Sequence, residues 1–108
     1  MKLEQVLNNP KTLQEFFSAD GRFDELIFYH EFEDAFVGLA WQFNHQAVIY
    51  NRQKCIEILM SHDMSEDEAI EYFEFNYLGA YLGESTPIFF TPIEPSEIFE
   101  NKAWLSDV

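Results

Sequence analysis

Apolar side chains recur at helical spacing in the first part of the chain, at Leu3, Val6, Leu7, Leu13, Phe16 and Phe17. Asn9 and Pro10 suit the start of a helix, because Asn caps the first backbone amides and Pro fits the first helical position. Asp20-Gly21 is a typical turn sequence. The pattern therefore predicts an N-terminal helical segment that ends at this turn.

The next apolar runs are rich in β-branched and aromatic residues, and they predict three strands. They cover residues 26–32 (LIFYHEF), 35–43 (AFVGLAWQF) and 47–50 (AVIY), with polar connections between them. In the second run, alternation places four apolar side chains on one face, those of Val37, Leu39, Trp41 and Phe43. We expect a small antiparallel sheet in which consecutive strands are neighbours, although the run 35–40 also fits a helix.

Two helices follow, and each has a recognisable start. Asn51 suits the N-cap of a helix over residues 52–61. Ser65 and Glu68 form a capping-box sequence, in which the Ser hydroxyl accepts from the Glu amide and the carboxylate reaches back. We expect this second helix to end at Gly79. Its buried stripe is predicted to consist of Ala69, Ile70, Phe73 and Tyr77.

The C-terminal part of the chain predicts a short strand and a turn. Gly83 and Pro87 bracket a turn, and residues 88–90 (IFF) form a short β-prone run. Ser96 suits the cap of a last helical turn that contains Ile98, Phe99, Trp104 and Leu105. The chain therefore predicts one α+β domain over residues 1–108, with an N-terminal helical segment, a small antiparallel sheet, two consecutive helices and a short C-terminal strand and turn.

Composition narrows what such a domain can do. Hydrophobic residues make up 47% of the 108-residue chain, which is typical of a folded domain rather than a disordered one. Twenty acidic residues outnumber six Lys and Arg, and the net charge is −14. Nucleic acids and anionic membrane surfaces attract Lys and Arg, so we expect direct binding to neither. No apolar run approaches the roughly 18 residues of a membrane-spanning helix.

Cysteine usage and the N-terminal residues indicate the compartment. The single Cys55 cannot form an internal disulfide, which fits a reducing environment. The first ten residues, MKLEQVLNNP, contain no apolar run like that of a secretory signal. We therefore expect the protein in the cytoplasm.

The acidic residues concentrate in one part of the chain. Between Lys54 and Lys102 there are eleven Asp and Glu and no Lys or Arg. On the second predicted helix, the face opposite the buried stripe carries Asp67, Glu71 and Glu74. Like charges at this spacing repel by a few tenths of a kcal/mol per pair, so a helix selected only for stability would mix the signs.

Phe75 is predicted to lie beside these carboxylates as an exposed ring. Carboxylates with interleaved rings resemble a nucleic-acid strand, which presents phosphates together with bases that can stack. We therefore predict a partner-binding site formed by Asp67, Glu71, Glu74 and Phe75, with Glu84 at its rim. The alternative is that the acidic face is only solvated.

Other residue clusters fit catalysis or metal binding less well. Along a strand, the run 30–34 (HEFED) would turn only His30 and Asp34 to one side, fewer than the three or four ligands of a metal site. Cys55 falls on the apolar side of its helix, where a lone Cys is typical of a core. The chain has no phosphate-binding loop, nucleophile elbow or zinc motif. We expect no catalytic residue, no metal and no cofactor.

Residues 35–89 also carry a family resemblance. Its most specific block is EFNYLGAYLGESTPIF, residues 74–89. Further matching positions are Ala35, Gly38, residues 48–50 (VIY), residues 55–60 (CIEILM), Met64, Ser65, Glu68 and Ala69. Over this half of the chain the protein resembles a family of small uncharacterised acidic proteins found in phage and bacterial genomes. The family has no established activity, so the resemblance implies a genomic setting and no mechanism.

These observations lead to one principal hypothesis and two alternatives. By analogy with anti-CRISPR and anti-restriction proteins, a small acidic phage-like protein is expected to inhibit a host protein by occupying its basic, nucleic-acid-binding surface. The aromatic content of 18% also suggests surplus apolar surface, which predicts a homodimer with a scaffolding role. Twenty carboxylates leave open a third hypothesis, a small hydrolase with a role for His30.

Overall fold

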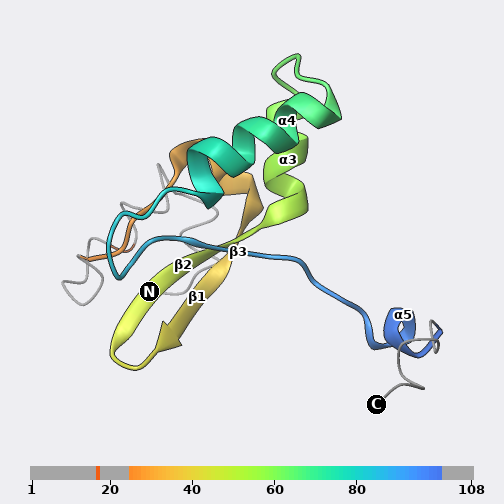
Figure 1. The fold of residues 1–108 in the computed structure, drawn as a ribbon. Coiled ribbons are helices and arrows are strands. Elements are labelled where there is room, and N and C mark those ends of the chain that lie inside the picture. Colours follow the sequence, from red (N-terminus) through yellow and green to blue (C-terminus); the bar gives the residue numbers. More distant parts are fainter. Residues whose placement is uncertain (1–16, 18–24, 101–108) are drawn as a thin grey trace.

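The computed structural model describes Phe17 and residues 25–100 of the chain, and Figure 1 shows the arrangement of its elements. Except for Phe17, the predicted N-terminal helical segment lies outside the described residues. The described elements mix helices with a small sheet, so the α+β class is confirmed. In chain order they are η2 (His30–Ala35), β1 (Phe36–Gln42), β2 (His45–Asn51), α3 (Arg52–Met60), α4 (Glu66–Phe73), η3 (Glu74–Leu78), β3 (Ile88–Phe90) and α5 (Pro95–Glu100).

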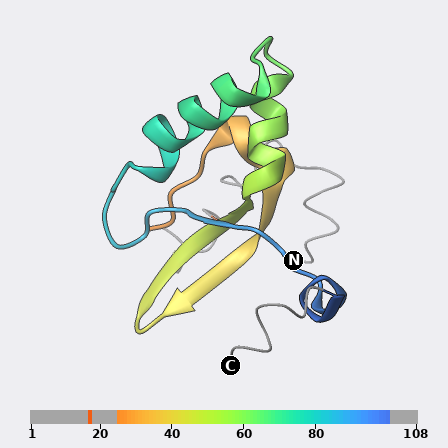
Figure 2. The same ribbon diagram turned by 45° about the vertical axis from the view of Figure 1, so that its right-hand side comes forward.

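The sheet has the strand order β1-β2-β3 and is mixed. β1 and β2 pair antiparallel as predicted, and β3 pairs parallel to β2. The chain returns to the sheet after α3 and α4, and such a long crossover is what parallel neighbours require. The two helices lie together at one end of the sheet, and the β1–β2 hairpin extends away from them (Figures 1 and 2).

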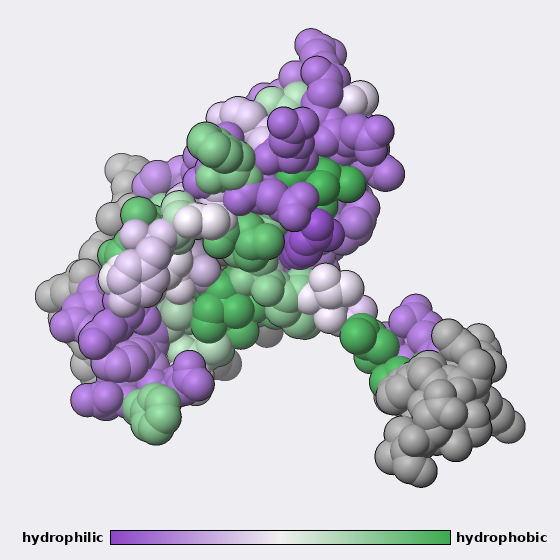
Figure 3. All heavy atoms as spheres, in the orientation of Figure 1, coloured by the Kyte–Doolittle hydropathy of each residue, from purple (hydrophilic) through white to green (hydrophobic). Residues whose placement is uncertain are grey.

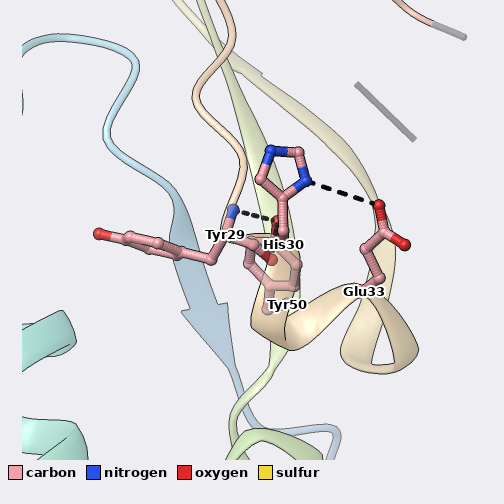
Figure 4. Close-up of polar contacts among 4 residues, drawn as sticks. All are labelled: Tyr29, His30, Glu33 and Tyr50. Atoms are coloured by element: carbon pink, nitrogen blue, oxygen red, sulfur yellow. Dashed lines mark hydrogen bonds and ion pairs between the residues drawn. The ribbon is translucent and has the colours of Figure 1, made fainter. Parts of the chain in front are cut away.

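The predicted strand at residues 26–32 is wrong. Residues 26–29 have no regular structure, and η2 is a 3₁₀ helix. The Tyr29 amide donates to the Tyr50 hydroxyl at 2.8 Å (Figure 4). The Phe32 amide donates to the Tyr29 carbonyl at 2.9 Å. These local and side-chain bonds occupy backbone groups that a sheet ladder would need. The aromatic residues of this run therefore fill the core from a folded-back segment instead of a strand.

The apolar face predicted for residues 35–43 is mostly exposed. Val37 is exposed, and Trp41 retains 65% of its accessible surface. Leu39 is half-buried and packs against the core. The strand ends at Gln42, one residue earlier than predicted, and Phe43 lies in the hairpin turn with a φ of 56°. A register shift between Phe36 and Gly38 interrupts the regular alternation at the start of the strand.

Both predicted helix starts are confirmed. The Asn51 side chain accepts from the Lys54 amide at 3.1 Å, which caps α3. In the capping box of α4, the Glu68 amide donates to the Ser65 hydroxyl at 3.2 Å, and the Ser65 amide donates to the Glu68 carboxylate at 3.0 Å. These bonds satisfy backbone donors that the first helical turn leaves unpaired.

The second helix changes its pitch before it ends. Its last part, η3, is a π-helix, and the Gly79 amide donates to the Glu74 carbonyl at 2.9 Å. Gly79 ends the helix as predicted but has a right-handed φ of −82°. A Cβ at this position would lie 3.1 Å from the Glu74 carbonyl oxygen. Close backbone approach, rather than a left-handed conformation, therefore favours glycine here.

Aromatic rings form most of the core between the helices and the sheet. Tyr50, Phe32 and Phe73 are fully buried, and the Phe73 ring meets the Phe89 ring edge to face at 4.7 Å. This contact joins α4 to β3. The predicted buried stripe of α4 is confirmed, because Ala69 and Phe73 are buried while Ile70 and Tyr77 pack against the same cluster.

The chain after β3 leads to α5, which lies apart from the other described elements (Figures 1 and 2). α5 begins at Pro95, so Ser96 lies inside the helix and not at its cap as predicted. Trp104 and Leu105 fall outside the described residues. Among the described helices, none is long and apolar enough to cross a membrane.

Candidate functional site

The outer face of α4 carries exposed carboxylates without basic partners. Its four acidic residues, Glu66, Asp67, Glu68 and Glu71, are exposed, and so is Glu74, which follows α4 as the first residue of η3. No ion pair to any of them is found in the described part of the chain. Figure 3 shows hydrophilic residues over much of the helical end of the molecule. The charge of this face is therefore uncompensated by neighbouring side chains.

Basic side chains are scarce around the helix. Arg52 and Lys54 are the only Lys and Arg within residues 25–100, and both belong to the first turn of α3. The Arg52 guanidinium lies 5.8 Å from the centre of the Phe73 ring, on the buried side of α4. It does not approach the acidic outer face, so that face remains free to attract cations from outside.

A shallow groove runs along this helix, and we call it the α4 groove. Its volume is about 360 Å³, and its lining residues are Met64, Glu68, Glu71, Tyr72, Phe75 and Asn76. Phe75 is 83% exposed, which leaves most of its ring accessible. The ring lies beside Glu68 and Glu71, as the helical wheel predicts. The α4 groove thus places the exposed Phe75 ring beside the carboxylates of Glu68 and Glu71.

Glu68 is held in place by the capping box. Its hydrogen bonds with the Ser65 backbone and side chain lower the pKa of the Glu68 carboxyl. Near neutral pH this side chain is therefore ionised and fixed at one end of the α4 groove. At the other end, the Asn76 side-chain amide donates to the Tyr72 carbonyl at 2.9 Å. Two of the lining side chains are thus oriented by bonds within the helix itself.

The π-helix η3 is held on its inner side by Tyr77. The Tyr77 hydroxyl donates to the Glu31 carboxylate at 3.0 Å, and this bond ties η3 to η2. Burial, together with the bond to the Glu31 carboxylate, raises the pKa of the Tyr77 hydroxyl. The Tyr77 ring also stacks on the Phe73 ring at 6.1 Å. With Tyr77 and Phe73 turned inward, Phe75 is left to project outward from the same segment.

The structure brings some of the predicted site residues together and separates others. Glu71 and Phe75 line the α4 groove, whereas Asp67 and Glu74 are exposed on the same helix outside its lining. Glu84 does not belong to this region. Its carboxylate lies 3.1 Å from His45 Nδ1 at the start of β2, in the hairpin that extends away from α3 and α4 (Figure 1).

Sequence reasoning missed four residues of the α4 groove, namely Met64, Glu68, Tyr72 and Asn76. Their spacing contains a usable signal, because Glu68, Tyr72 and Asn76 are four residues apart and Glu71 and Phe75 form a parallel row. These two rows of side chains form the walls of the α4 groove. The sequence analysis predicts the carboxylates and the Phe75 ring of this site but not the groove between the two rows.

The His30 cluster differs from the prediction because residues 30–34 form a 3₁₀ helix and not a strand. His30 Nδ1 lies 3.8 Å from Glu33 Oε1, one helical turn further on (Figure 4). The expected pairing of His30 with Asp34 by strand alternation is therefore wrong. Among the described residues, no group of three or more His, Cys, Asp or Glu could hold a metal ion.

Cys55 is a core residue, as its position on the apolar side of α3 predicts. Its side chain is fully buried, and burial raises the pKa of its thiol to about 12. The protonated thiol is a poor nucleophile, so this environment favours packing over reactivity.

Comparisons of the chain with protein-family models, with curated proteins and with solved structures give no match. The described site combines fixed negative charge, an exposed ring and a shallow furrow on one helix. Such a surface can attract cationic side chains and stack against flat groups.

Proposed function

We propose that this protein is a non-catalytic binding protein that occupies a basic, nucleic-acid-binding surface of another protein. The observation that carries the proposal is the acidic outer face of α4, whose exposed carboxylates have no basic partner among the described residues. Uncompensated like charges on one helix repel one another and reduce its stability slightly. A partner of opposite charge would relieve this repulsion and bind to the same carboxylates.

The density of charge on α4 supports imitation of a phosphate backbone. Five carboxylates lie between Glu66 and Glu74. At about 1.5 Å per residue they fall within roughly 12 Å of helix axis, which is about one charge per 3 Å. A single DNA strand carries one charge per about 3.4 Å of axis. The spacing of negative charges along this helix is therefore similar to that along a DNA strand. A surface that binds the phosphates of a strand can bind these carboxylates in the same way.

The exposed ring of Phe75 supports the same function. Proteins that hold single-stranded nucleic acids combine a basic groove with aromatic side chains on which bases stack. Phe75, at 83% exposure, presents a flat face to such a ring, and Tyr72 lies beside it in the α4 groove. The carboxylates and the aromatic ring can then contact the partner from the same helix.

For the biological setting, we propose a phage-type inhibitor or modulator in the cytoplasm of a bacterial host. This proposed setting follows from the family resemblance expected for residues 35–89. A CRISPR or restriction complex is the kind of partner we propose, because each must expose a basic surface to bind its nucleic acid.

The decisive experiment is capture followed by competition. Immobilised protein is incubated with lysate of a bacterial host, and duplex or single-stranded DNA is then added. We expect basic proteins to be retained and to be released by the DNA, because the two ligands compete for one surface. The free protein should not bind the DNA itself at about 0.15 M salt.

A matched pair of variants tests whether α4 is responsible. The triple variant Asp67→Asn, Glu71→Gln, Glu74→Gln removes three charges from the α4 face. The control Glu57→Gln, Glu94→Gln, Glu97→Gln removes three exposed charges elsewhere. We expect the first variant alone to lose DNA-sensitive capture, and Phe75→Ala to weaken it without changing its salt dependence. Equal capture by both triple variants would mean that the α4 face is only solvated.

A second candidate function, a homodimeric scaffold, is favoured by the exposed apolar side chains of β1. Val37 and Trp41 project from a strand that, within the described residues, is at the edge of the sheet. An open edge with apolar side chains is a common route to self-association. Light scattering at about 100 µM should then give a dimer mass, and a monomer mass at this concentration removes the candidate.

A further inference from the structure

A second hollow lies beside the β1–β2 hairpin, and we call it the hairpin pocket. β2 pairs with β3 only through its last three residues, Ile49, Tyr50 and Asn51. Toward the hairpin turn, the loop before β3 separates from β2 and leaves a space of about 620 Å³. The lining residues come from two distant stretches of chain, and they are Ala40, Trp41, Gln42, His45, Gln46, Ala47, Tyr81, Gly83, Glu84, Thr86 and Ile88.

The loop wall of the hairpin pocket is held by its own hydrogen bonds. The Thr86 hydroxyl accepts from the Leu82 amide at 2.8 Å and donates to the Gly83 carbonyl at 2.6 Å. Gly83 adopts a φ of 116°, which only glycine adopts readily, and this reverses the chain. The turn therefore presents Glu84 at a defined position.

The contact between Glu84 and His45 closes the far end of the pocket. His45 Nδ1 lies 3.1 Å from Glu84 Oε2, and it joins the loop to the start of β2. The described residues supply Glu84 with no basic partner other than His45. The Glu84 side chain is 69% exposed, so its carboxylate remains accessible to a ligand.

Aromatic rings supply the other recognition element. Trp41 is 65% exposed and Tyr81 is 77% exposed, and neither ring pairs with another ring of the described residues. Ala40, Ala47 and Ile88 give the floor aliphatic surface, and no Lys or Arg lines the pocket. Open rings beside a carboxylate attract a flat organic cation, since the ring faces and the oxygens are both negative.

We propose that the hairpin pocket binds an arginine side chain of the basic partner. The guanidinium group is planar, so it can stack on Trp41 or Tyr81 while its N–H groups reach the exposed carboxylate of Glu84. A lysine ammonium group has no flat face and fits this combination less well. The occupant is a partner's arginine and not a neutral side chain, because the pocket carries one carboxylate in a chain of net charge −14.

This inference rests on the proposed function and adds a second contact to it. The α4 groove and the hairpin pocket share no lining residue. Of the elements that carry them, α4 lies at one end of the sheet and the β1–β2 hairpin extends away from it (Figure 1). A partner that engages both must present basic side chains at two separate points of its surface. Such spacing gives selectivity that general charge attraction lacks.

The direct test uses a small probe and nuclear magnetic resonance. Full-length protein is titrated with N-acetyl-arginine amide and, in parallel, with the corresponding citrulline amide, a neutral molecule of nearly the same shape. We expect arginine to shift the Trp41 indole signal and the amides of residues 81–86, with a dissociation constant on the order of 1 mM. Citrulline should shift them much less. Equal shifts from both probes, or arginine shifts confined to α4, overturn the inference.

Variants assign the effect to the carboxylate and the rings. Glu84→Gln should weaken arginine binding by about tenfold, since it removes the charge and keeps the shape. Tyr81→Ala should weaken it as well, whereas Glu94→Gln, an exposed acid outside both sites, should not. Amide spectra confirm that each variant is folded. Unchanged affinity in both Glu84→Gln and Tyr81→Ala contradicts the assignment.

The test also separates this inference from the proposed function. If the α4 triple variant loses DNA-sensitive capture while arginine fails to bind the pocket, the inference falls and the proposed function stands. If arginine binds the pocket while the α4 triple variant still captures its partner, the proposed role of α4 falls instead.

Discussion

The α4 groove and the hairpin pocket both place carboxylates beside exposed rings, but they are built in different ways. Every lining residue of the α4 groove lies within residues 64–76, and the capping box and the Asn76 bond hold it from within the helix. The hairpin pocket combines residues 40–47 with residues 81–88. Its shape exists only because β3 pairs with β2 and because His45 meets Glu84.

This difference indicates how each site responds to change. The α4 groove depends on local helix geometry, so it should persist when distant loops are disturbed. The hairpin pocket depends on the relation between two segments, so it should be lost when either segment moves. Both regions depend on the aromatic core, where Phe73 of α4 meets Phe89 of β3 at 4.7 Å.

The largest expected effect comes from breaking that shared contact. Phe73→Ala should lower the free energy of unfolding by about 3–5 kcal/mol, because it leaves a cavity at a fully buried position. Both sites should be damaged together. Phe75→Ala is a matched control on the same helix, and its 83% exposed side chain predicts a change below about 0.5 kcal/mol. Chemical denaturation measures both, and similar losses would contradict the assignment of the core.

Alkaline pH should also destabilise both sites through the core. Burial raises the pKa of the Tyr50 hydroxyl and of the Cys55 thiol to about 12 each. The unfolded chain ionises first, so this stability is complete below the unfolded pKa values of about 9 to 10 and is lost as pH rises toward 12. The limiting slope is about 1.4 kcal/mol per pH unit for each group. Denaturation curves at several pH values measure it, and Cys55→Ala should reduce the slope.

A smaller and more local effect is expected at the turn of the hairpin pocket. Gly83→Ala should cost about 1–3 kcal/mol, because a side chain is strained at a φ of 116°. Amide signals of residues 81–86 should move, while those of the α4 groove should not. Gly38→Ala is the matched control, since no atom lies within 4 Å of its added Cβ and its φ is ordinary. Equal spectral change in both regions would show that the two sites are not independent.

The smallest effect is expected from neutralising the outer face of α4. The triple variant Asp67→Asn, Glu71→Gln, Glu74→Gln should leave stability unchanged or raise it by a few tenths of a kcal/mol per relieved pair. The gain should vanish at high salt, where exposed charges are screened. Thermal melts at low and high salt measure it. A loss above about 1 kcal/mol would mean that these carboxylates have a structural role.

The sequence could predict the α4 region in detail because its determinants are close together along the chain. Asn51, Ser65 and Glu68 cap helices through bonds that span three residues. The exposed position of Phe75 follows from the same periodicity. The π-helix η3, which ends this helical region, was not predicted, and its Tyr77 bonds to Glu31 from a distant segment.

The hairpin pocket could not be predicted in this way. Residues 26–32 have the composition of a strand, yet they form none. The Tyr29 amide donates a hydrogen bond to the Tyr50 hydroxyl, and the segment continues into the 3₁₀ helix η2. The parallel pairing of β3 and the approach of Glu84 to His45 also involve residues far apart in the chain. The predicted place of Glu84, at the rim of the acidic helix, assumed nearness in space from nearness in sequence.

By itself, therefore, the sequence determined the α+β class, the helix starts, the acidic face and the buried positions of Cys55 and Phe73. These depend on periodicity, capping and hydrophobicity, which act over a few residues. The tertiary structure alone decided the mixed sheet, the folded-back aromatic segment and the hairpin pocket. Each of these requires groups distant in sequence to satisfy one another's hydrogen bonds or to fill one core, and local patterns carry no record of such partners.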